Sequence, residues 1–314
     1  MPEPAQVGLI GCGAIGHRHA RALAGQVGLC WHSRSRASAE HFQARFGGRV
    51  CETFAEMLAM EQVEAVVIAT PPQCHCEQVL QALEAGKSVL IEKPLCVSPE
   101  ELEAIERGVE ACPGPFLMVA ENYCYKPSLA RIRRLIEQDR IGAVRSVQVA
   151  KCTRPQVEGW RRQYGALLEG GIHFAALVDE IFGVAPVRVT AEFPGRRPDQ
   201  SERHSRTRLE YPDGAAAELH YAWDVPSLPG GLFQHSRIRG ERGSIGFESN
   251  GLYLWLRRGP RLRPYVGGWG DLMGYGAMTE DFLACLRDRR RRPHSDLARA
   301  RRALEIVFRA YGLL

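Results

Sequence analysis

The chain has 314 residues, of which 45% are hydrophobic and 25% charged, and its formal net charge is +5. This composition excludes the disordered and fibrous classes of protein, and the length favours two domains over one. The longest apolar run, 63–70, is far shorter than the roughly 20 residues that cross a bilayer. No secretory signal opens the sequence, so we expect a soluble, cytoplasmic protein that does not act on a membrane.

The cysteines and arginines predict no specialised site. The segment Cys74-His75-Cys76 suggests zinc, but no second pair of ligands follows at a finger-like distance. Structural thiols without a metal are therefore favoured. The arginine-rich segment 287–292 is either a nucleic-acid patch or a solvated helix end. Because no aromatic residues are interleaved with it, we expect no nucleic-acid partner.

Residues 7–120 alternate apolar runs with helical patterns. This alternation predicts βαβ units around a parallel sheet, so we expect a doubly wound Rossmann domain over residues 1–122. Ser98 and Pro99 stand where a capping serine and a first-turn proline begin a helix. The predicted strands are 7–10, 27–32, 63–69, 88–91 and 116–120, and the predicted helices are 18–24, 37–46, 54–59, 75–85 and the segment after Ser98.

After position 122 strands follow strands, separated by turns such as Pro-Asp-Gly. This order predicts a mainly antiparallel sheet with added helices, an α+β domain over residues 123–314. The fold class is thus α/β with a second domain. Helices are expected at 128–138, 167–182, 275–286 and 297–313, and strands at 144–150, 187–193, 206–211, 215–221, 236–240 and 252–256.

The glycine motif Gly11-Cys12-Gly13-Ala14-Ile15-Gly16 follows the first predicted strand and opens the helix predicted at 18–24. Gly11 permits a tight turn, Gly13 lets the backbone approach a pyrophosphate, and Gly16 lets helix and sheet pack closely. The helix N-terminus offers amide protons to the anion. The motif therefore predicts a dinucleotide site, the alternative being a glycine turn that binds no ligand.

The end of the second predicted strand bears on which dinucleotide binds. A site selective for NAD places a carboxylate there to bind the ribose hydroxyls. Positions 4 to 39 contain no acidic residue, and the strand is followed by Ser33, Arg34 and Arg36. A hydroxyl and guanidinium groups bind a 2′-phosphate through charge-assisted hydrogen bonds. We therefore predict a preference for NADP(H), with NAD(H) as the alternative.

Further motifs continue in order along nearly the whole chain. They are Ala69-Thr70-Pro71-Pro72 with His75, the segment 85–94 ending in Glu92-Lys93-Pro94, Glu121-Asn122-Tyr123 with Pro127, Ile141-Gly142, and the segment from Glu169 to His173. In this order they resemble the Gfo/Idh/MocA family of NAD(P)-dependent oxidoreductases. The resemblance implies hydride transfer between the nicotinamide and a carbonyl or carbinol carbon of a small molecule such as a keto-sugar, cyclic polyol, ketone or imine. It also implies a homodimer or homotetramer formed through the open sheet of the second domain.

The resemblance also implies roles for single residues. Lys93 is presented to the reacting hydroxyl or carbonyl, where an ammonium stabilises developing negative charge. His173 is the acid or base beside the substrate, and Glu169, four residues earlier on one helix face, orients it. The structural alternatives are an ion-paired Lys93 and a helix-surface His173. The implied cofactor contacts are Thr70, Pro71, Pro72, His75, Glu92, Lys93, Pro94 and Asn122, and the candidate substrate contacts are Lys93, Tyr123, Trp160 and His173.

The sequence departs from the family pattern at three positions. Glu169 replaces the usual aspartate, Ala176 stands where a further aspartate is common, and Cys124 replaces an arginine. The last two changes remove polar contacts to a polyhydroxylated sugar, so we expect a less sugar-like substrate. Two alternatives to a dehydrogenase or reductase stay open: a redox-neutral enzyme with tightly bound cofactor, and a dinucleotide-sensing regulator without catalysis.

Overall fold

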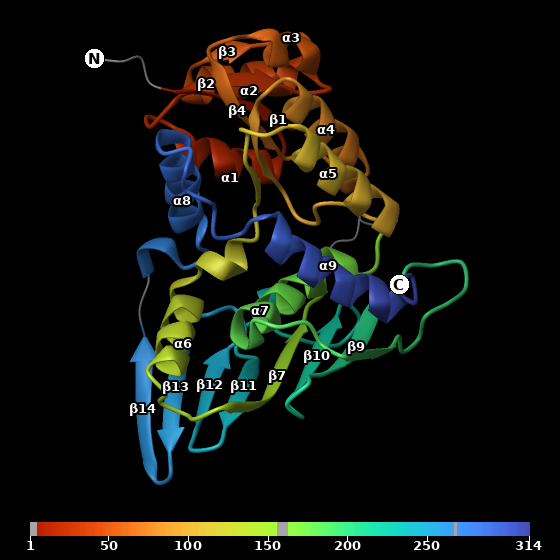
Figure 1. Ribbon diagram of the computed structural model, residues 1–314, viewed down its shortest axis with the longest axis vertical. Helices are drawn as coiled ribbons and strands as arrows, with labels where there is room; N and C mark the ends of the chain where they lie inside the picture. Colours follow the sequence, from red (N-terminus) through yellow and green to blue (C-terminus); the bar gives the residue numbers. More distant parts are fainter. Residues whose placement is uncertain (1–4, 156–162, 267–268) are drawn as a thin grey trace. The chain divides into compact units, whose positions relative to one another are not determined.

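The computed structural model describes residues 5–155, 163–266 and 269–314 (Figure 1). Internal contacts divide the chain into two units. The first comprises Met1–Glu121 and Tyr275–Ala300, and the second comprises Asn122–Gly274 and Arg301–Leu314. The chain thus returns to the first unit near its C-terminal end. The predicted domains, 1–122 and 123–314, are each one continuous range and contain no such return.

The first unit is built on a six-stranded sheet in the order β3-β2-β1-β4-β5-β6, with all neighbours parallel. The predicted doubly wound sheet is confirmed. Its central strands are buried apolar runs, as expected where helices cover both faces of a sheet. The two-residue β3 was not predicted. The strands are β1 (Gln6–Ile10), β2 (Gly28–His32), β3 (Arg49–Val50), β4 (Val63–Ile68), β5 (Ser88–Ile91) and β6 (Leu117–Val119).

Helices connect these strands, and their starts follow local capping chemistry. Ser35, Thr53 and Ser98 cap α2, α3 and α5 by accepting a backbone N–H bond in the first turn. The first helix begins at Ala14, within the glycine motif and directly after Gly13, so the predicted start at 18 was wrong. The helices of this unit are α1 (Ala14–Leu23), α2 (Arg36–Phe46), α3 (Phe54–Ala59), α4 (His75–Glu84), α5 (Pro99–Ala111) and α8 (Tyr275–Arg287).

The second unit contains an eight-stranded sheet in the order β14-β13-β12-β11-β7-β10-β9-β8. All neighbouring pairs are antiparallel except β7 and β10, which are parallel, so the predicted mainly antiparallel sheet is confirmed. The strands are β7 (Val144–Cys152), β8 (Arg188–Glu192), β9 (His204–Glu210), β10 (Ala216–Ala222), β11 (His235–Gly240), β12 (Ser244–Glu248), β13 (Tyr253–Arg258) and β14 (Arg261–Val266).

One face of this sheet packs against α7 (Ile172–Phe182), which contacts β7 and β10 (Figure 1). Val147 and Leu219 are buried on that face, whereas Glu218 and Arg237 alternate to the other face and are exposed. The unit also contains α6 (Pro127–Glu137), the π-helical segment η4 (Leu167–Gly171) and most of α9 (Leu297–Tyr311). In the described ranges, no helix is both long and apolar enough to span a bilayer.

Candidate functional site

The glycine-rich turn joins β1 to α1, as the sequence predicts. Gly11 has a φ of +94°, and a Cβ at this position would lie 2.5 Å from the carbonyl oxygen of Ala69. A Cβ on Gly16 would lie 2.1 Å from the carbonyl oxygen of Gly11. Glycine at both positions therefore allows the turn to pass close to the end of β4 and α1 to begin directly against the turn.

Gly13 provides open space at the N-terminus of α1. No heavy atom lies within 4 Å of the position that a Cβ on Gly13 would take. Gly13 is also the N-cap of α1, and the first turn, which Ala14 and Ile15 open, has no side-chain cap and no acidic residue. The amide groups of this turn are therefore available to an anion. This cradle fits the pyrophosphate of a dinucleotide, and it lies at the carboxyl edge where open α/β sheets bind ligands.

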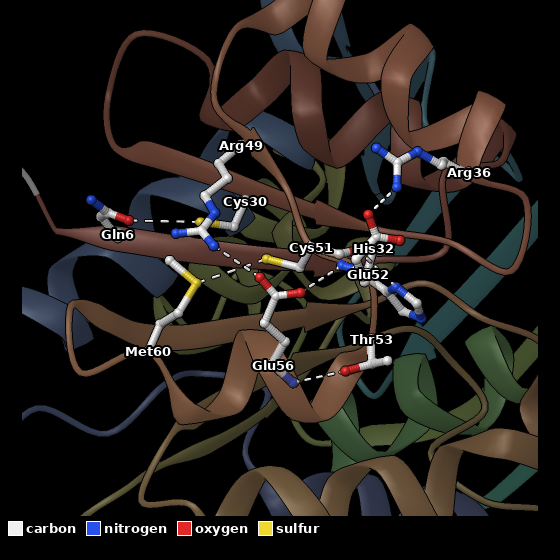
Figure 2. A network of polar contacts seen from close by, with 10 residues as sticks. All are labelled: Gln6, Cys30, His32, Arg36, Arg49, Cys51, Glu52, Thr53, Glu56 and Met60. Carbon is white, nitrogen blue, oxygen red and sulfur yellow. Dashed lines mark hydrogen bonds and ion pairs between the residues drawn. The ribbon is translucent and has the colours of Figure 1, made fainter.

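The segment after β2 carries the residues predicted to bind a 2′-phosphate. Arg34 is exposed, and within the described residues its side chain makes no hydrogen bond or ion pair; Ser33 beside it is half-buried. Arg36 is engaged: its Nε donates to Oε1 of Glu40 at 2.8 Å, and its Nη1 contacts the carboxylate of Glu52 (Figure 2). The hydrogen bonds to these carboxylates raise the pKa of Arg36.

His75 ties together the turns that follow β4 and β5. It is fully buried, with Nδ1 2.8 Å from the carbonyl oxygen of Pro94 and Nε2 2.9 Å from that of Thr70. Burial lowers the pKa of His75, although both carbonyl contacts oppose this shift. The neutral ring has one N–H and donates to one of these oxygens at a time. The neighbouring Pro71 and Pro72 lead the chain into α4. His75 therefore holds the turn after β4 and the turn after β5 together through their carbonyl oxygens.

Glu92 forms a buried pair with a histidine that the sequence analysis missed. Its Oε1 lies 2.8 Å from Nε2 of His19 on α1, and both side chains are buried. Burial by itself raises the pKa of Glu92, but the hydrogen bond and charge of His19 and the charge of Lys93 hold the pKa below its ordinary value. The other carboxylate oxygen accepts the backbone N–H of Lys93 at 3.3 Å. The pair thus fixes the backbone at Lys93.

In the second unit, the structure brings Tyr123 and His173 together. Their rings stack with centroids 4.4 Å apart and an interplanar angle of 15°. Lys151 donates from Nζ to the Tyr123 hydroxyl at 3.1 Å. Lys126 lies with Nζ 3.6 Å from the centroid of the Tyr123 ring and donates to the carbonyl oxygen of Asn250 at 2.9 Å. Two candidate substrate contacts therefore share one cluster with two lysines.

Lys151 was not singled out from the sequence, although the alternation of side chains along β7 could have indicated it. It shares a strand face with Val147 and Val149, which are buried, so a lysine occupies an inward-facing position. Asn122, a predicted cofactor contact, donates from Nδ2 to the carbonyl oxygen of Met273 at 2.7 Å. Lys93 belongs to the first unit, and Asn122, Tyr123 and His173 belong to the second.

Glu169 and His173 lie on the predicted helical stretch, but its first part is the π-helical segment η4. A π-helical turn is wider than an α-helical turn, so the four-residue spacing of a regular helix does not by itself place the two side chains on one face. Their direct contact therefore stays a prediction. A Cβ on Gly170 would lie 2.2 Å from the ring of Tyr221, so this glycine allows the segment to pack against β10.

Buried Glu202 anchors the start of η4. Its Oε1 accepts the backbone N–H of Leu167 at 2.8 Å and the hydroxyl of Tyr311 at 2.7 Å. Burial raises the pKa of Glu202, and these hydrogen bonds oppose the shift. No sequence motif marks this residue, because its partners come from distant parts of the chain.

Two further features of the described residues concern metal binding and space for a substrate. In ranges 5–155, 163–266 and 269–314, no group of three or more His, Cys, Asp and Glu side chains is placed to hold a metal ion. A cavity of about 20 Å³ beside Tyr123 and Phe174 has room for about one water molecule and not for a substrate. The predicted substrate contact Trp160 lies outside the described residues.

Comparison with known proteins gives relatives over both units. Inositol 2-dehydrogenase of Rhizobium meliloti is 30% identical over 188 residues, which are 59% of this chain and 57% of that protein. A dTDP-3,4-didehydro-2,6-dideoxy-alpha-D-glucose 3-reductase of Actinomadura kijaniata is 32% identical over 204 residues, 62% of this chain and 57% of that protein. Each match therefore covers little more than half the length of the relative.

The fold matches a solved structure over nearly its whole length. The 3-ketoreductase KijD10 from Actinomadura kijaniata, in complex with NADP and TDP-benzene, superposes with a TM-score of 0.83 at 22% identity, covering 98% of this chain and 97% of that one. Two family models match the sequence itself: the oxidoreductase family with an NAD-binding Rossmann fold at residues 5–112, and the GFO/IDH/MocA C-terminal domain at residues 129–246. The chain therefore belongs to the Gfo/Idh/MocA family of oxidoreductases.

Proposed function

We propose that this chain is an NADP(H)-dependent oxidoreductase that transfers a hydride between the nicotinamide and a carbonyl or carbinol carbon of a small-molecule substrate. The observation that carries the proposal is the uncapped N-terminus of α1 beneath the open position of Gly13, at the carboxyl edge of a doubly wound sheet. Membership of an oxidoreductase family and the dehydrogenase and reductase names of its relatives support it.

The preference for NADP(H) rests on the segment after β2. Arg34 is exposed and has no partner within the described residues, so its guanidinium is available to a 2′-phosphate. A guanidinium binds phosphate oxygens through two parallel hydrogen bonds, which a free ribose diol does not match. The NADP in the KijD10 complex is consistent with this preference.

In this proposal, bound NADPH supplies the hydride and the protein handles the proton and the charge. Lys93 stabilises negative charge that develops on the substrate oxygen. His173 donates the proton, because an imidazole titrates near neutral pH, and Glu169 orients His173. Tyr123, which stacks on His173, contacts the substrate and keeps the imidazole ring in place.

The proposed substrate class is a keto-sugar, a cyclic polyol or a related ketone or imine. The names of the two relatives support a sugar or polyol. Ala176 and Cys124 are both buried and supply neither a carboxylate nor a guanidinium. Fewer polar partners favour a substrate with fewer hydroxyl groups than a hexose.

The test offers purified protein and NADPH a panel of ketones, keto-sugars, imines and linear tetrapyrroles while the absorbance of NADPH is followed. Oxidation of NADPH with at least one member supports the proposal. Calorimetry with NADPH and NADH provides the decisive counter-test, because a folded chain that binds neither dinucleotide does not have this function.

We also propose that the chain associates as a homodimer or homotetramer through the open face of the second unit's sheet. His235, Tyr253 and Trp255 form an aromatic cluster there, with the His235 Nε2 2.8 Å from the Tyr253 hydroxyl. Leu262 and Val266 on β14 pair with β13 on the same face and are 62% and 64% exposed. Exposed apolar side chains gathered on one sheet face are typical of an association surface.

A further inference from the structure

Arg36 is held by two carboxylates that lie far apart in the sequence. Glu40 follows one turn later on α2 and accepts from the Nε of Arg36 at 2.8 Å. Glu52 comes from the segment after β3 and contacts the terminal Nη1 (Figure 2). The side chains of Arg36, Glu40 and Glu52 are 61%, 51% and 66% exposed, so all three face solvent.

The pairing of β3 with β2 brings Glu52 to this position. Val50 is the partner of Trp31 in the parallel ladder, and the backbone N–H of Cys51 donates to the carbonyl oxygen of Trp31 at 2.8 Å. Glu52 follows next, and its own N–H donates to the carboxylate of Glu56 at 2.7 Å (Figure 2). The backbone of Glu52 is therefore fixed beside the end of β2, the segment to which a 2′-phosphate is assigned.

The two carboxylates occupy different parts of the guanidinium. Glu40 accepts from Nε and leaves the two terminal nitrogens of Arg36 to other partners. Glu52 takes one of these terminal nitrogens. A phosphate binds a guanidinium through the same donors, so a carboxylate on Nη1 and a phosphate compete for one group. The carboxylate is also a like charge for the phosphate.

We propose that Glu52 sets the cofactor selectivity of this chain by competing with the 2′-phosphate for Arg36; this inference rests on the proposed function. Arg34 is then the first phosphate contact, and Arg36 becomes the second only when Glu52 is displaced. Removing the charge of Glu52 strengthens the binding of a 2′-phosphorylated adenosine and leaves the binding of an unphosphorylated one unchanged.

The experiment measures calorimetric affinities of the whole chain for adenosine 2′,5′-bisphosphate and for 5′-AMP, which need neither a nicotinamide nor a substrate. We expect Glu52→Gln to bind the bisphosphate roughly two- to fivefold more tightly, the scale of an exposed charge pair. Its affinity for 5′-AMP stays that of the original chain. Because salt screens exposed charges, the gain disappears at about 1 M salt.

The matched control is Glu103→Gln on α5, which removes an equal charge from another exposed arginine pair. It leaves both affinities unchanged. In an Arg36→Gln background, Glu52→Gln gives no gain. Melting temperatures confirm that each variant is folded.

Four outcomes overturn the inference: no gain with Glu52→Gln, an equal gain with 5′-AMP, a gain that survives Arg36→Gln, or no detectable binding of the bisphosphate to any variant. The proposed function is tested separately by NADPH and NADH turnover. An original chain that prefers NADH, together with the expected gain in Glu52→Gln, upholds the role of Glu52 and refutes the NADP(H) preference. A chain that oxidises NADPH but shows no gain with Glu52→Gln supports the proposed function and overturns the role of Glu52.

Discussion

At the scale of single residues, the proposed preference for NADP(H) rests on Arg34. Hydrogen bonds to charged groups contribute about 1.5–3 kcal/mol. Arg34→Ala should therefore weaken NADPH binding by roughly ten- to a hundredfold and leave NADH binding nearly unchanged. Paired dissociation constants for the two dinucleotides measure the difference. Arg107→Ala on α5, which removes an exposed arginine elsewhere, should change neither. Equal losses for NADPH and NADH in Arg34→Ala would refute the phosphate assignment.

His173 carries the proposed proton transfer. General acid catalysis of this kind contributes about a hundred- to ten-thousandfold, so His173→Ala should lower kcat by that amount while NADPH binds normally. The pH dependence of the residual rate should also lose the step that His173 causes. Tyr123→Phe is the comparison, because it keeps the ring that stacks on His173 and removes only the hydroxyl bonded to Lys151. Full activity of His173→Ala on the true substrate would contradict the assignment.

The buried pair of His19 and Glu92 gives a stability prediction with a defined sign. His19→Ala leaves a buried carboxylate without its partner. It should lower the free energy of unfolding, measured by urea denaturation, by about 3–5 kcal/mol. Because the pKa of Glu92 is held below its ordinary 4.5, its contribution is present above pH 4.5 and is lost as the pH falls through the lowered value. Adding Glu92→Gln to His19→Ala should recover part of the loss. Unchanged stability in His19→Ala would contradict this account.

Single residues show where the sequence is sufficient and where it is not. The glycines could be predicted because their roles depend on the adjacent turn. His19 and Glu52 could not, because their partners are distant: Glu92 follows β5, far along the chain from α1, and Glu52 reaches Arg36 only through the pairing of a two-residue strand. The absence of acidic residues from positions 4 to 39 therefore does not reveal the carboxylate of Glu52, which the fold places beside Arg36.

At the scale of elements, Glu202 links η4 to α9. Glu202→Ala removes the acceptor for the N–H of Leu167 and the hydroxyl of Tyr311, and should cost about 1–3 kcal/mol. Glu202→Gln keeps an acceptor oxygen and should be tolerated. Because burial raises the pKa of Glu202, its stabilising contribution is full below the ordinary 4.5 and is lost as the pH rises through the raised value.

Urea unfolding between pH 4 and 8 checks this sign. The stability of the original chain relative to Glu202→Gln should fall as the pH rises. A stability difference that stays constant or grows with pH would show that the pKa of Glu202 is not raised.

The length and periodicity of an element decided whether it could be predicted. The long helices and buried strands were placed within a few residues, because each has its own apolar pattern. Three strands were missed. β3 has only two residues, β12 contains Gly246, and β14 contains Pro264 and arginines. Proline is confined to edge strands such as β14, and only the neighbouring strands make such a segment recognisable.

At the scale of the whole molecule, local sequence patterns do not show the path of the chain between the two units. The helical pattern of 275–286 shows that a helix forms and does not show which core it joins. Contacts of α8 with α1, including the rings of Tyr275 and His19 with centroids 5.7 Å apart, assign it to the first unit. A C-terminal segment that packs on an N-terminal core leaves no local signal.

Association through the open sheet face is the prediction that belongs to this scale. An unpaired charge buried in an interface costs about 3–5 kcal/mol, so Val266→Asp should shift a dimer or tetramer towards monomers at micromolar concentration. Sedimentation velocity of the original chain and the variant measures the shift. Val184→Asp is the matched control, because Val184 is 51% exposed, lies after α7 and is not on the sheet. A monomeric original chain, or equal dissociation of both variants, would show that the open face is not the association surface, whereas selective dissociation of Val266→Asp would locate the contact at β14.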